Sequence, residues 1–172
     1  MRIVNFGSLN IDYVYRVDEF LRPGKTKPAR SREIFCGGKG LNQSIACARA
    51  GLSTFHAGFL GYEGMFLKEK LAESGVATDF IREVKQTCGH AIIQVSDSGQ
   101  NCILLYPGTN ALLTETFADE VLSHFSSGDV ALFQNETNLV PELIEKASRK
   151  GLKVALNAAP FTEAVKAFPL EL

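Results

Sequence analysis

The chain has 172 residues with 45% hydrophobic and 22% charged side chains, which is typical of one folded globular domain rather than a disordered segment. Its net charge of −1 supplies no long-range field toward nucleic acid or an anionic membrane, and no basic stripe interleaved with aromatic residues occurs, so neither partner is expected. The N-terminus has no long apolar stretch, and the four cysteines and three histidines match no zinc or disulfide spacing, so we expect a cytoplasmic protein with reduced cysteines and no metal site.

The first part of the chain predicts two kinds of strand. Residues 2–8 are predicted as a strand that ends in Gly-Ser, a sequence typical of a chain reversal. Residues 11–17 alternate between two faces, which is the pattern of a half-exposed strand, and residues 31–36 are predicted to return after a Pro-Gly turn. Half-exposed strands do not fit the core of a doubly wound sheet, so we expect them in a small sheet that stands off from it.

The middle of the chain mixes helices with a hairpin. Residues 40–50 and 65–73 have helical spacing and each segment is followed by a glycine, with a strand predicted between them over residues 54–60. Residues 89–95 and 100–106 are predicted as two strands around Ser-Asp-Ser-Gly, which is typical of a hairpin turn. Because no helix separates these two strands, we expect the hairpin to join the small sheet.

The last part of the chain has a regular alternation of strands and helices. Helices are predicted over residues 114–125 and 139–150, and short apolar strands over residues 129–133 and 153–156. Apolar strands that alternate with helices are typical of a parallel sheet covered on both faces. The fold class is therefore predicted to be α/β, with a small additional sheet.

The run Gly-Gly-Lys-Gly-Leu-Asn at residues 37–42 leads from a predicted strand into a predicted helix. It is not a Walker A loop, because no Gly-Lys-Ser/Thr occurs, and it is not a dinucleotide fingerprint, because Gln43 stands where the third glycine would be. Glycines would let the backbone approach a ligand closely, and the start of the helix would offer free N–H donors. A tight turn selected only for its geometry is the alternative, and the loop alone leaves the two interpretations even.

Polar side chains also follow three of the predicted strands. Asn10 and Asp12 stand two residues apart, so in extended backbone they project to one face. A carboxylate accepts hydroxyl hydrogen bonds and an amide both donates and accepts, so this pair suits a polyol; two solvated residues on an exposed strand would have the same pattern. Glu136 and Asn157 follow the last two apolar strands, at the edge where α/β sheets bind ligands, and a glutamate that begins a helix is the common alternative for Glu136.

Six motifs in a fixed order make the chain similar to the ribokinase/PfkB family of carbohydrate kinases over essentially its whole length. They are Gly-Ser-Leu-Asn-Ile-Asp at residues 7–12, Pro-Gly-Lys-Thr at 23–26, Gly-Gly-Lys-Gly-Leu-Asn-Gln at 37–43, Pro-Gly-Thr-Asn-Ala-Leu at 107–112, Gln-Asn-Glu at 134–136 and Leu-Asn-Ala-Ala-Pro at 156–160. The glycine loop in this setting is fairly specific, and the ordered set is a strong signal.

The resemblance implies a particular architecture. It implies a ribokinase-like parallel sheet flanked by helices, with a small β-sheet lid over a sugar site. The lid strands would lie at approximately residues 11–17, 31–36, 89–95 and 100–106. The residues implied as sugar contacts are Asn10, Asp12, Gly38, Lys39, Asn42 and Glu136.

The resemblance also implies an activity and its partners. The activity would be ATP-dependent transfer of phosphate to the terminal hydroxymethyl group of ribose or a similar sugar, giving ribose 5-phosphate from ribose. The complete enzyme would use ATP, Mg²⁺ and a monovalent cation, and it would form a homodimer through its lids.

By the same resemblance, residues 1–172 are the N-terminal part of one ribokinase-like domain, because family members run to roughly 300 residues. The family's Asn-x-x-Glu motif, linked to magnesium and phosphate, does not occur before Leu172. The Gly-Ala-Gly-Asp-like motif, which carries the catalytic Asp base, is also absent from this sequence. We therefore expect the sugar site and the lid in this chain, a sheet that is incomplete on its C-terminal side, and no catalytic residue.

Two alternatives stay open. The first is a non-catalytic sugar-binding or interaction fragment, which would bind sugar without transferring phosphate. The second is another PfkB kinase, of the fructokinase or phosphofructokinase type, since such kinases share Gly-Gly-Lys-Gly. The pair of Asn10 and Asp12 favours the ribokinase type.

Overall fold

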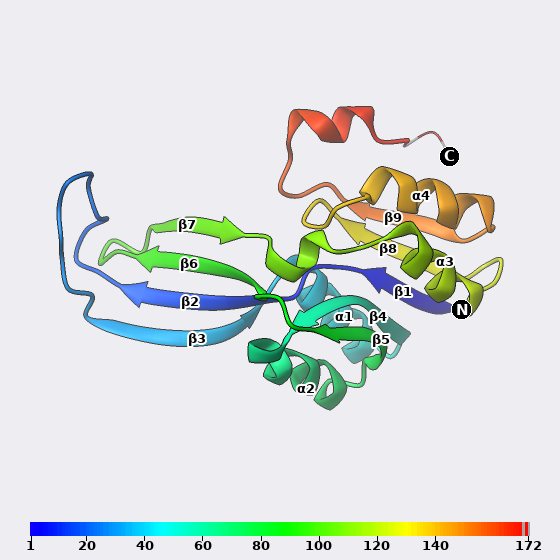
Figure 1. The fold of residues 1–172 in the computed structure, drawn as a ribbon, viewed down its shortest axis with the longest axis horizontal. Coiled ribbons are helices and arrows are strands. Elements are labelled where there is room, and N and C mark those ends of the chain that lie inside the picture. Colours follow the sequence, from blue (N-terminus) through cyan, green and yellow to red (C-terminus); the bar gives the residue numbers. More distant parts are fainter. Residues whose placement is uncertain (170, 172) are drawn as a thin grey trace.

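The structure is a computed structural model that describes residues 1–169 and 171, and within them the strands form two separate sheets (Figure 1). The larger sheet is parallel and has the order β5-β4-β1-β8-β9. Its strands are β1 (Arg2–Phe6), β4 (Ser53–Gly61), β5 (Ala77–Val84), β8 (Val130–Gln134) and β9 (Lys153–Asn157). A parallel sheet of apolar strands needs cover on both faces, and helices supply it.

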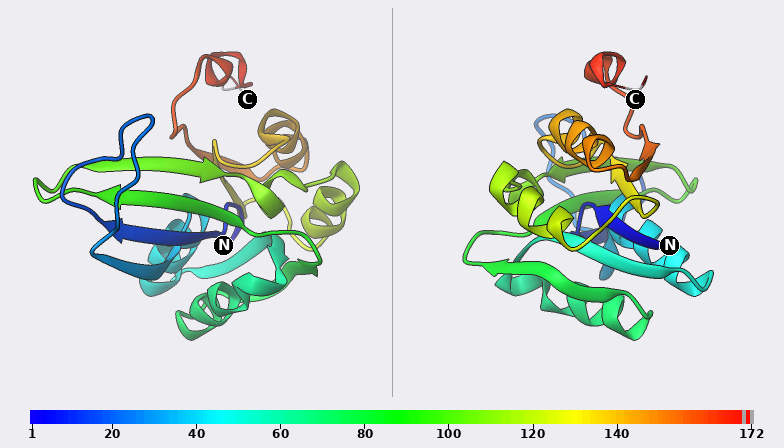
Figure 2. Two further views of the ribbon diagram at one scale, coloured as in Figure 1. Left: turned by 60° about the vertical axis from the view of Figure 1, so that its left-hand side comes forward. Right: turned by 90° about the vertical axis from the view of Figure 1, so that its right-hand side faces the viewer.

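The helices lie on the two faces of the larger sheet (Figure 2). They are α1 (Lys39–Arg49) and α2 (Met65–Glu73) on one face and α3 (Glu115–Ser123) and α4 (Val140–Arg149) on the other, with short 3₁₀ turns η1 (Tyr62–Gly64), η2 (Gly108–Ala111) and η3 (Glu163–Ala167). Thr114 caps α3, because its side chain accepts from the N–H of Phe117 at 3.1 Å. In the described part of the chain, no helix combines the length and apolar character needed to cross a membrane.

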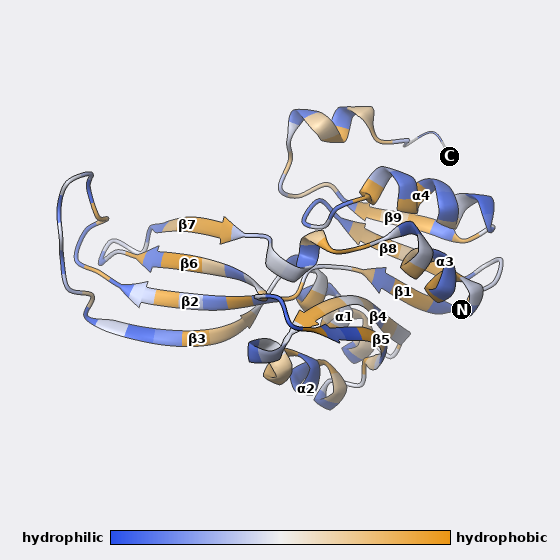
Figure 3. Cartoon of the chain, viewed as in Figure 1, coloured by the Kyte–Doolittle hydropathy of each residue, from blue (hydrophilic) through white to orange (hydrophobic). Residues whose placement is uncertain are grey.

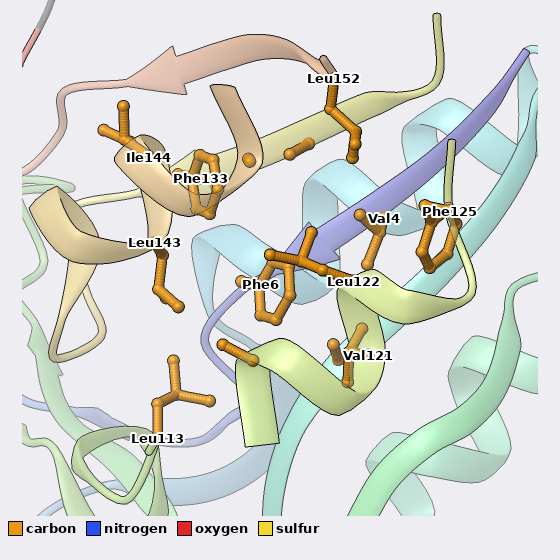
Figure 4. Packing of buried hydrophobic residues seen from close by; sticks show 14 of the residues in the cluster. Val4, Phe6, Leu113, Val121, Leu122, Phe125, Phe133, Leu143, Ile144 and Leu152 are labelled. Carbon is orange, nitrogen blue, oxygen red and sulfur yellow. The ribbon is translucent and has the colours of Figure 1, made fainter. Parts of the chain in front are cut away.

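The core on the face of α3 and α4 anchors the middle of the larger sheet. Phe6 of β1 and Phe133 of β8 stack with their ring centroids 5.8 Å apart. Leu122 of α3 and Leu143 of α4 belong to the same buried cluster (Figure 4). Burying each of these side chains stabilises the fold by about 1.5–3 kcal/mol, so this layer holds the carboxyl ends of β1 and β8 in fixed positions.

The smaller sheet, called here the lid sheet, has the order β3-β2-β6-β7. Its strands are β2 (Asn10–Arg16), β3 (Ser31–Gly37), β6 (Gly89–Val95) and β7 (Asn101–Tyr106). It projects from one end of the larger sheet, and β7 forms a free edge that is exposed along its length (Figure 1). Apolar residues remain accessible there: Leu104 is 68% exposed, and Figure 3 shows hydrophobic colour along β7.

The predicted fold class, α/β with a parallel sheet flanked by helices and a small second sheet, is confirmed. The four segments predicted for the small sheet agree with β2, β3, β6 and β7 to within one residue. Strand β5 was not among the predicted elements. It carries Asp79, Arg82 and Glu83 and lies at the edge of the larger sheet, so it lacks the apolar run that identifies a buried strand.

Candidate functional site

The six residues implied as ligand contacts come together where the lid sheet meets the larger sheet. One cavity of about 180 Å³ is lined by all of them, namely Asn10, Asp12, Gly38, Lys39, Asn42 and Glu136. They come from β2, from α1 and the residue before it, and from the loop after β8. Residues up to 126 positions apart thus form a single polar surface.

The lid sheet supplies the apolar side of this cavity. Ala91 and Ile93 of β6 and Ile103 and Leu105 of β7 line it, on the face of the lid sheet that also carries Asp12. A neighbouring cavity of about 110 Å³ shares Leu105, and it also includes residues from the loops after β8 and β9. A small polar pocket with one apolar wall suits a sugar, which carries hydroxyl groups on a hydrocarbon ring.

Glu136 is the central carboxylate of the polar side. Its side chain is only 9% exposed and lies 3.1 Å from the ammonium group of Lys39. Glu136 Oε2 also accepts from the hydroxyl of Ser8 at 2.6 Å and from the N–H of Lys39 at 3.0 Å. This carboxylate is therefore fixed by the glycine loop and by the turn after β1, and it is not free to rotate.

The start of α1 does not offer free N–H donors, so that expectation is wrong. The N–H of Lys39 donates to Glu136, and the N–H of Gly40 donates to Ser8 Oγ at 3.1 Å. Those of the next two residues donate to the carbonyls of Ser8 and Gly38, at 2.9 and 3.1 Å. The protein's own groups occupy the positions at which a phosphate would bind a helix N-terminus.

The glycines of this loop are required by close backbone contacts. A Cβ on Gly37 would overlap the carboxylate of Asp12, and a Cβ on Gly40 would overlap the backbone nitrogen of Ser8. Gly38 has φ of 96°, a conformation that favours glycine. The geometric interpretation of the loop is therefore correct for these contacts, and the loop lines the cavity as well.

Asn10 and Asp12 differ in how far their hydrogen-bonding capacity is used. Asn110 Nδ2 donates to Asn10 Oδ1 at 2.7 Å, which orients the Asn10 amide. The carboxylate of Asp12 has no side-chain hydrogen bond within residues 1–169 and 171. Burial, and then the negative charge of Glu136, raise the pKa of Asp12 to about 6, while Lys39 acts in the opposite direction. Asp12 is thus a partly buried acceptor that faces the cavity with its lone pairs unused.

Two supporting residues were not singled out from the sequence. Ser8 and Asn110 lie in motifs quoted for the family resemblance, but neither was given a role. Asn110 is 5% exposed, and its Oδ1 accepts from the N–H of Leu9 at 2.9 Å. Asn157, singled out as a polar residue after a strand, does not line the main cavity, because its side chain accepts from the N–H of Ala159 at 3.1 Å.

The start of α1 does not fit a phosphate group. Within residues 1–169 and 171 there is no group of three or more His, Cys, Asp or Glu side chains that could hold a metal. The N–H groups at the start of α1 are already bonded within the chain.

The chain is similar to known proteins in both sequence and structure. The family model described as pfkB family carbohydrate kinase matches residues 1–165. The chain is 36% identical over 159 residues to a ribokinase of Haemophilus influenzae, covering 90% of this chain and 52% of that protein. It is 29% identical over 166 residues to a deoxyribokinase of Salmonella typhimurium, covering 93% and 54%. The crystal structure of a ribokinase from Cryptococcus neoformans in complex with ADP is similar, with a TM-score of 0.81 and 31% identity over 99% of this chain and 54% of that one.

The extent of these matches matters for what they imply. The chain spans about half the length of the curated relatives it matches. The family model, in contrast, covers almost all of the chain, from β1 through β9. By this match and by its fold, the chain belongs to the pfkB family of carbohydrate kinases.

Proposed function

We propose that the protein is an ATP-dependent sugar kinase of the ribokinase type, and that the cavity between the two sheets binds ribose. The observation that carries this proposal is the carboxylate of Asp12, which faces the cavity without a side-chain partner in the described part of the chain. A carboxylate in this position can accept two hydroxyl hydrogen bonds, which compensates for its desolvation. Vicinal hydroxyl groups of a pentose supply that pair of donors.

The other polar groups of the cavity complement this arrangement. Asn10 is oriented by Asn110, and the ammonium of Lys39 and the amide of Asn42 supply donors beside it. Glu136 is held in place by Lys39, so its orientation does not depend on the ligand. A preorganised polar surface of this kind binds a polyol with little loss of side-chain entropy.

The phosphate donor would be ATP, and Mg²⁺ and a monovalent cation are expected for the complete enzyme. The ADP complex of the Cryptococcus neoformans relative supports a nucleotide as donor. Residues 1–172 would form the N-terminal part of one ribokinase-like domain, with the sugar site and the lid, and the catalytic Asp would come from sequence beyond this part. The protein is proposed to act in the cytoplasm.

A second copy of the chain is the proposed partner of the lid sheet. Phe35, Ile103 and Leu105 project from the face of this sheet that also lines the cavity, and they are 48%, 51% and 50% exposed. Exposed apolar side chains that lie together on a projecting sheet favour association. The molar mass in solution, measured by light scattering, tests for this homodimer, and a monomer at all concentrations would contradict it.

The test of the proposed function combines ribose binding with turnover. We expect calorimetry to detect ribose binding, and Asp12→Ala to remove most of the affinity because it deletes a charged acceptor. Asp79→Ala, at an exposed position on β5 away from the cavity, is the matched control and should bind like the wild type. If Asp12→Ala binds ribose normally, the assignment of the cavity is wrong.

The same measurements separate the alternatives. Ribose-dependent release of ADP supports the kinase, whereas binding without ADP release supports a non-catalytic sugar-binding fragment. The fragment alternative rests on one observation, namely that the sugar-sized cavity is formed by the described residues alone. Competition with 2-deoxyribose and with fructose 6-phosphate then distinguishes a ribokinase from a deoxyribokinase or a phosphofructokinase type.

A further inference from the structure

Behind the glycine loop, four polar side chains lie buried on the face of the larger sheet that α1 covers. Asn5, His56 and Gln134 come from the adjacent strands β1, β4 and β8, and Ser44 comes from α1; each is 0% exposed. Asn5 and His56 are register partners in the parallel pair β1–β4. Polar groups in such positions destabilise a core unless they are hydrogen-bonded.

The chain of hydrogen bonds ends on one side at the carbonyl of Gly40. Because a carbonyl oxygen only accepts, Asn5 must turn its NH₂ group toward it. Asn5 Nδ2 donates to this oxygen and to Ser44 Oγ, both at 2.8 Å. The oxygen of Asn5 is then an acceptor, and Gln134 Nε2 donates to it at 2.8 Å.

On the other side the chain ends at the carbonyl of Gly7. His56 Nε2 lies 3.1 Å from this oxygen, so Nε2 carries the proton and Nδ1 is an acceptor. Ser44 Oγ, 2.8 Å from Nδ1, donates to it while it accepts from Asn5. Burial lowers the pKa of His56 to about 4, in agreement with the neutral ring that this pattern requires.

The two carbonyls belong to glycines at which two loops touch. A Cβ added to Gly7 would lie 2.6 Å from the Cα of Gly40, so no side chain can separate these backbones. The next residue, Ser8, accepts from the N–H of Gly40 and donates to Glu136. Any shift between the two loops therefore moves the groups that orient Glu136 in the cavity.

We propose that Asn5, Ser44 and His56 are positioning residues, which hold the turn after β1 against the start of α1 and thereby fix Glu136 in the sugar site. The proposal rests on the proposed function of the cavity. Replacing all members of a buried hydrogen-bonded set by apolar groups can be neutral for stability, so stability alone does not account for this set. The set branches to Gln134, and its other two ends donate to the carbonyls of Gly40 and Gly7, which together select one arrangement of the two segments.

The test compares Ser44→Ala with Thr54→Val in the whole protein. Ser44→Ala interrupts the series of hydrogen bonds between Asn5 and His56. Thr54→Val removes another buried hydroxyl from the strand that carries His56. Thr54 Oγ1 donates to the carbonyl of Leu52 at 3.0 Å, and this bond is not part of the series of hydrogen bonds that includes Ser44. Ser44→Ala loses two buried hydrogen bonds, to Asn5 and to His56, and Thr54→Val loses one. We expect Tm to fall by about 2–4 °C in Thr54→Val and by about twice as much in Ser44→Ala.

Three measurements distinguish a positioning role from a general loss of stability: ribose affinity, amide hydrogen exchange and the protonation of His56. We expect Ser44→Ala to weaken ribose binding about tenfold, since small displacements in a site cost affinity, and Thr54→Val to leave it within about twofold. Amide hydrogen exchange at Lys39 and Gly40, whose N–H groups bond to Glu136 and Ser8, should become about tenfold faster in Ser44→Ala only. In ¹⁵N spectra, His56 of the wild type should show a protonated Nε2 and an unprotonated Nδ1.

Two results would overturn the proposal. One is an equal change of ribose affinity in the two variants; the other is a His56 ring protonated on Nδ1 in the wild type at neutral pH. If the wild type binds no ribose, the proposed function fails by itself. Amide exchange still decides the positioning role in that case, because equal exchange at Lys39 and Gly40 in both variants contradicts it.

Discussion

Glu136 and Lys39 are joined twice across 97 residues of sequence, through the N–H of Lys39 at 3.0 Å and through its ammonium group at 3.1 Å. The carboxylate occupies the N-terminus of α1, where an external anion would otherwise bind, and it satisfies a donor that the helix leaves free. Both residues also line the cavity. The contact between β8 and α1 and the shape of the candidate site therefore depend on the same pair.

The first prediction concerns the charge of this pair. Glu136→Gln keeps an acceptor for the N–H of Lys39 and removes the ionic attraction. We expect the free energy of unfolding to fall by about 1 kcal/mol, because the Lys39 side chain is 38% exposed and solvent screens it, and ribose affinity to fall as well. Urea unfolding and calorimetry measure both. The control is Glu163→Gln, which removes an exposed ion pair with Lys166 and should change neither; equal losses in the two variants would contradict the prediction.

The second prediction concerns the pH dependence that Asp12 gives to stability. Its pKa is raised from 3.8 to about 6 by burial and by Glu136, so the folded state holds this proton more tightly than the unfolded chain. The stability from Asp12 is therefore fully present below pH 3.8 and is lost as pH rises through 6. Because the side chain still faces solvent, we expect Asp12→Asn to stabilise the fold by only about 1 kcal/mol at pH 7 and by nothing at pH 4.

The corresponding measurement is urea unfolding of Asp12→Asn and wild type from pH 4 to 8. A stabilisation that is the same at every pH would mean that Asp12 has an ordinary pKa. Loss of ribose binding together with a gain of stability at neutral pH would identify Asp12 as a residue kept for binding at a cost to the fold.

The third prediction concerns His56, whose effect on stability has the opposite sign. Burial lowers its pKa from 6.5 to about 4, so the unfolded chain binds this proton more tightly. The stability from His56 is full above pH 6.5 and is lost as pH falls toward 4, by on the order of 3 kcal/mol. Asp12 acts in nearly the same pH range with the opposite sign and partly hides this loss. In Asp12→Asn, where this opposing effect is absent, we expect the full loss on the order of 3 kcal/mol between pH 6.5 and 4. A free energy of unfolding that stays constant over this range in Asp12→Asn would contradict the prediction.

The elements and site residues that could be predicted from the sequence depend on local patterns. The alternation along β2 and the apolar runs of β8 and β9 identify those strands from a few consecutive residues. Asn10 and Asp12 were singled out because they stand two residues apart in an extended strand, and Glu136 because it follows a strand of the larger sheet. The carboxyl ends of parallel strands meet at one edge of a sheet, so sequence position fixes their place in space.

The supporting contacts could not be predicted, because they join residues far apart in the sequence. Asn5 bonds to Ser44 and Gln134, which are 39 and 129 residues away, and periodicity carries no information about such pairs. One signal was present in the sequence. Asn5 and His56 interrupt apolar strands at positions expected to be buried, and a polar residue in such a place needs a partner. The satisfied N–H groups of α1 were also hidden, because Ser8 and Glu136 approach them from other strands.

The fourth prediction concerns the glycines of the loop. A Cβ on Gly40 would overlap the backbone of Gly7 and Ser8, which cannot move aside without separating β1 from α1. We expect Gly40→Ala to lower the free energy of unfolding by about 3 kcal/mol, the upper end of the cost of overpacking. A Cβ on Gly37 would overlap the Asp12 carboxylate, which is a side chain and can rotate away. Gly37→Ala should therefore cost about 1 kcal/mol and weaken ribose binding strongly.

Gly75→Ala is the control for these two variants. Gly75 has φ of +84° and no atom within 4 Å of an added Cβ, so its substitution causes only the backbone strain of a left-handed conformation, about 1 kcal/mol, and no loss of ribose binding. Urea unfolding and calorimetry on the three variants measure both quantities. A cost for Gly40→Ala no greater than for Gly75→Ala would mean that the loops at Gly7 and Gly40 can separate. The orientation of Glu136 by Ser8 would then not depend on their contact, because the hydrogen bonds at this junction could form at more than one loop spacing.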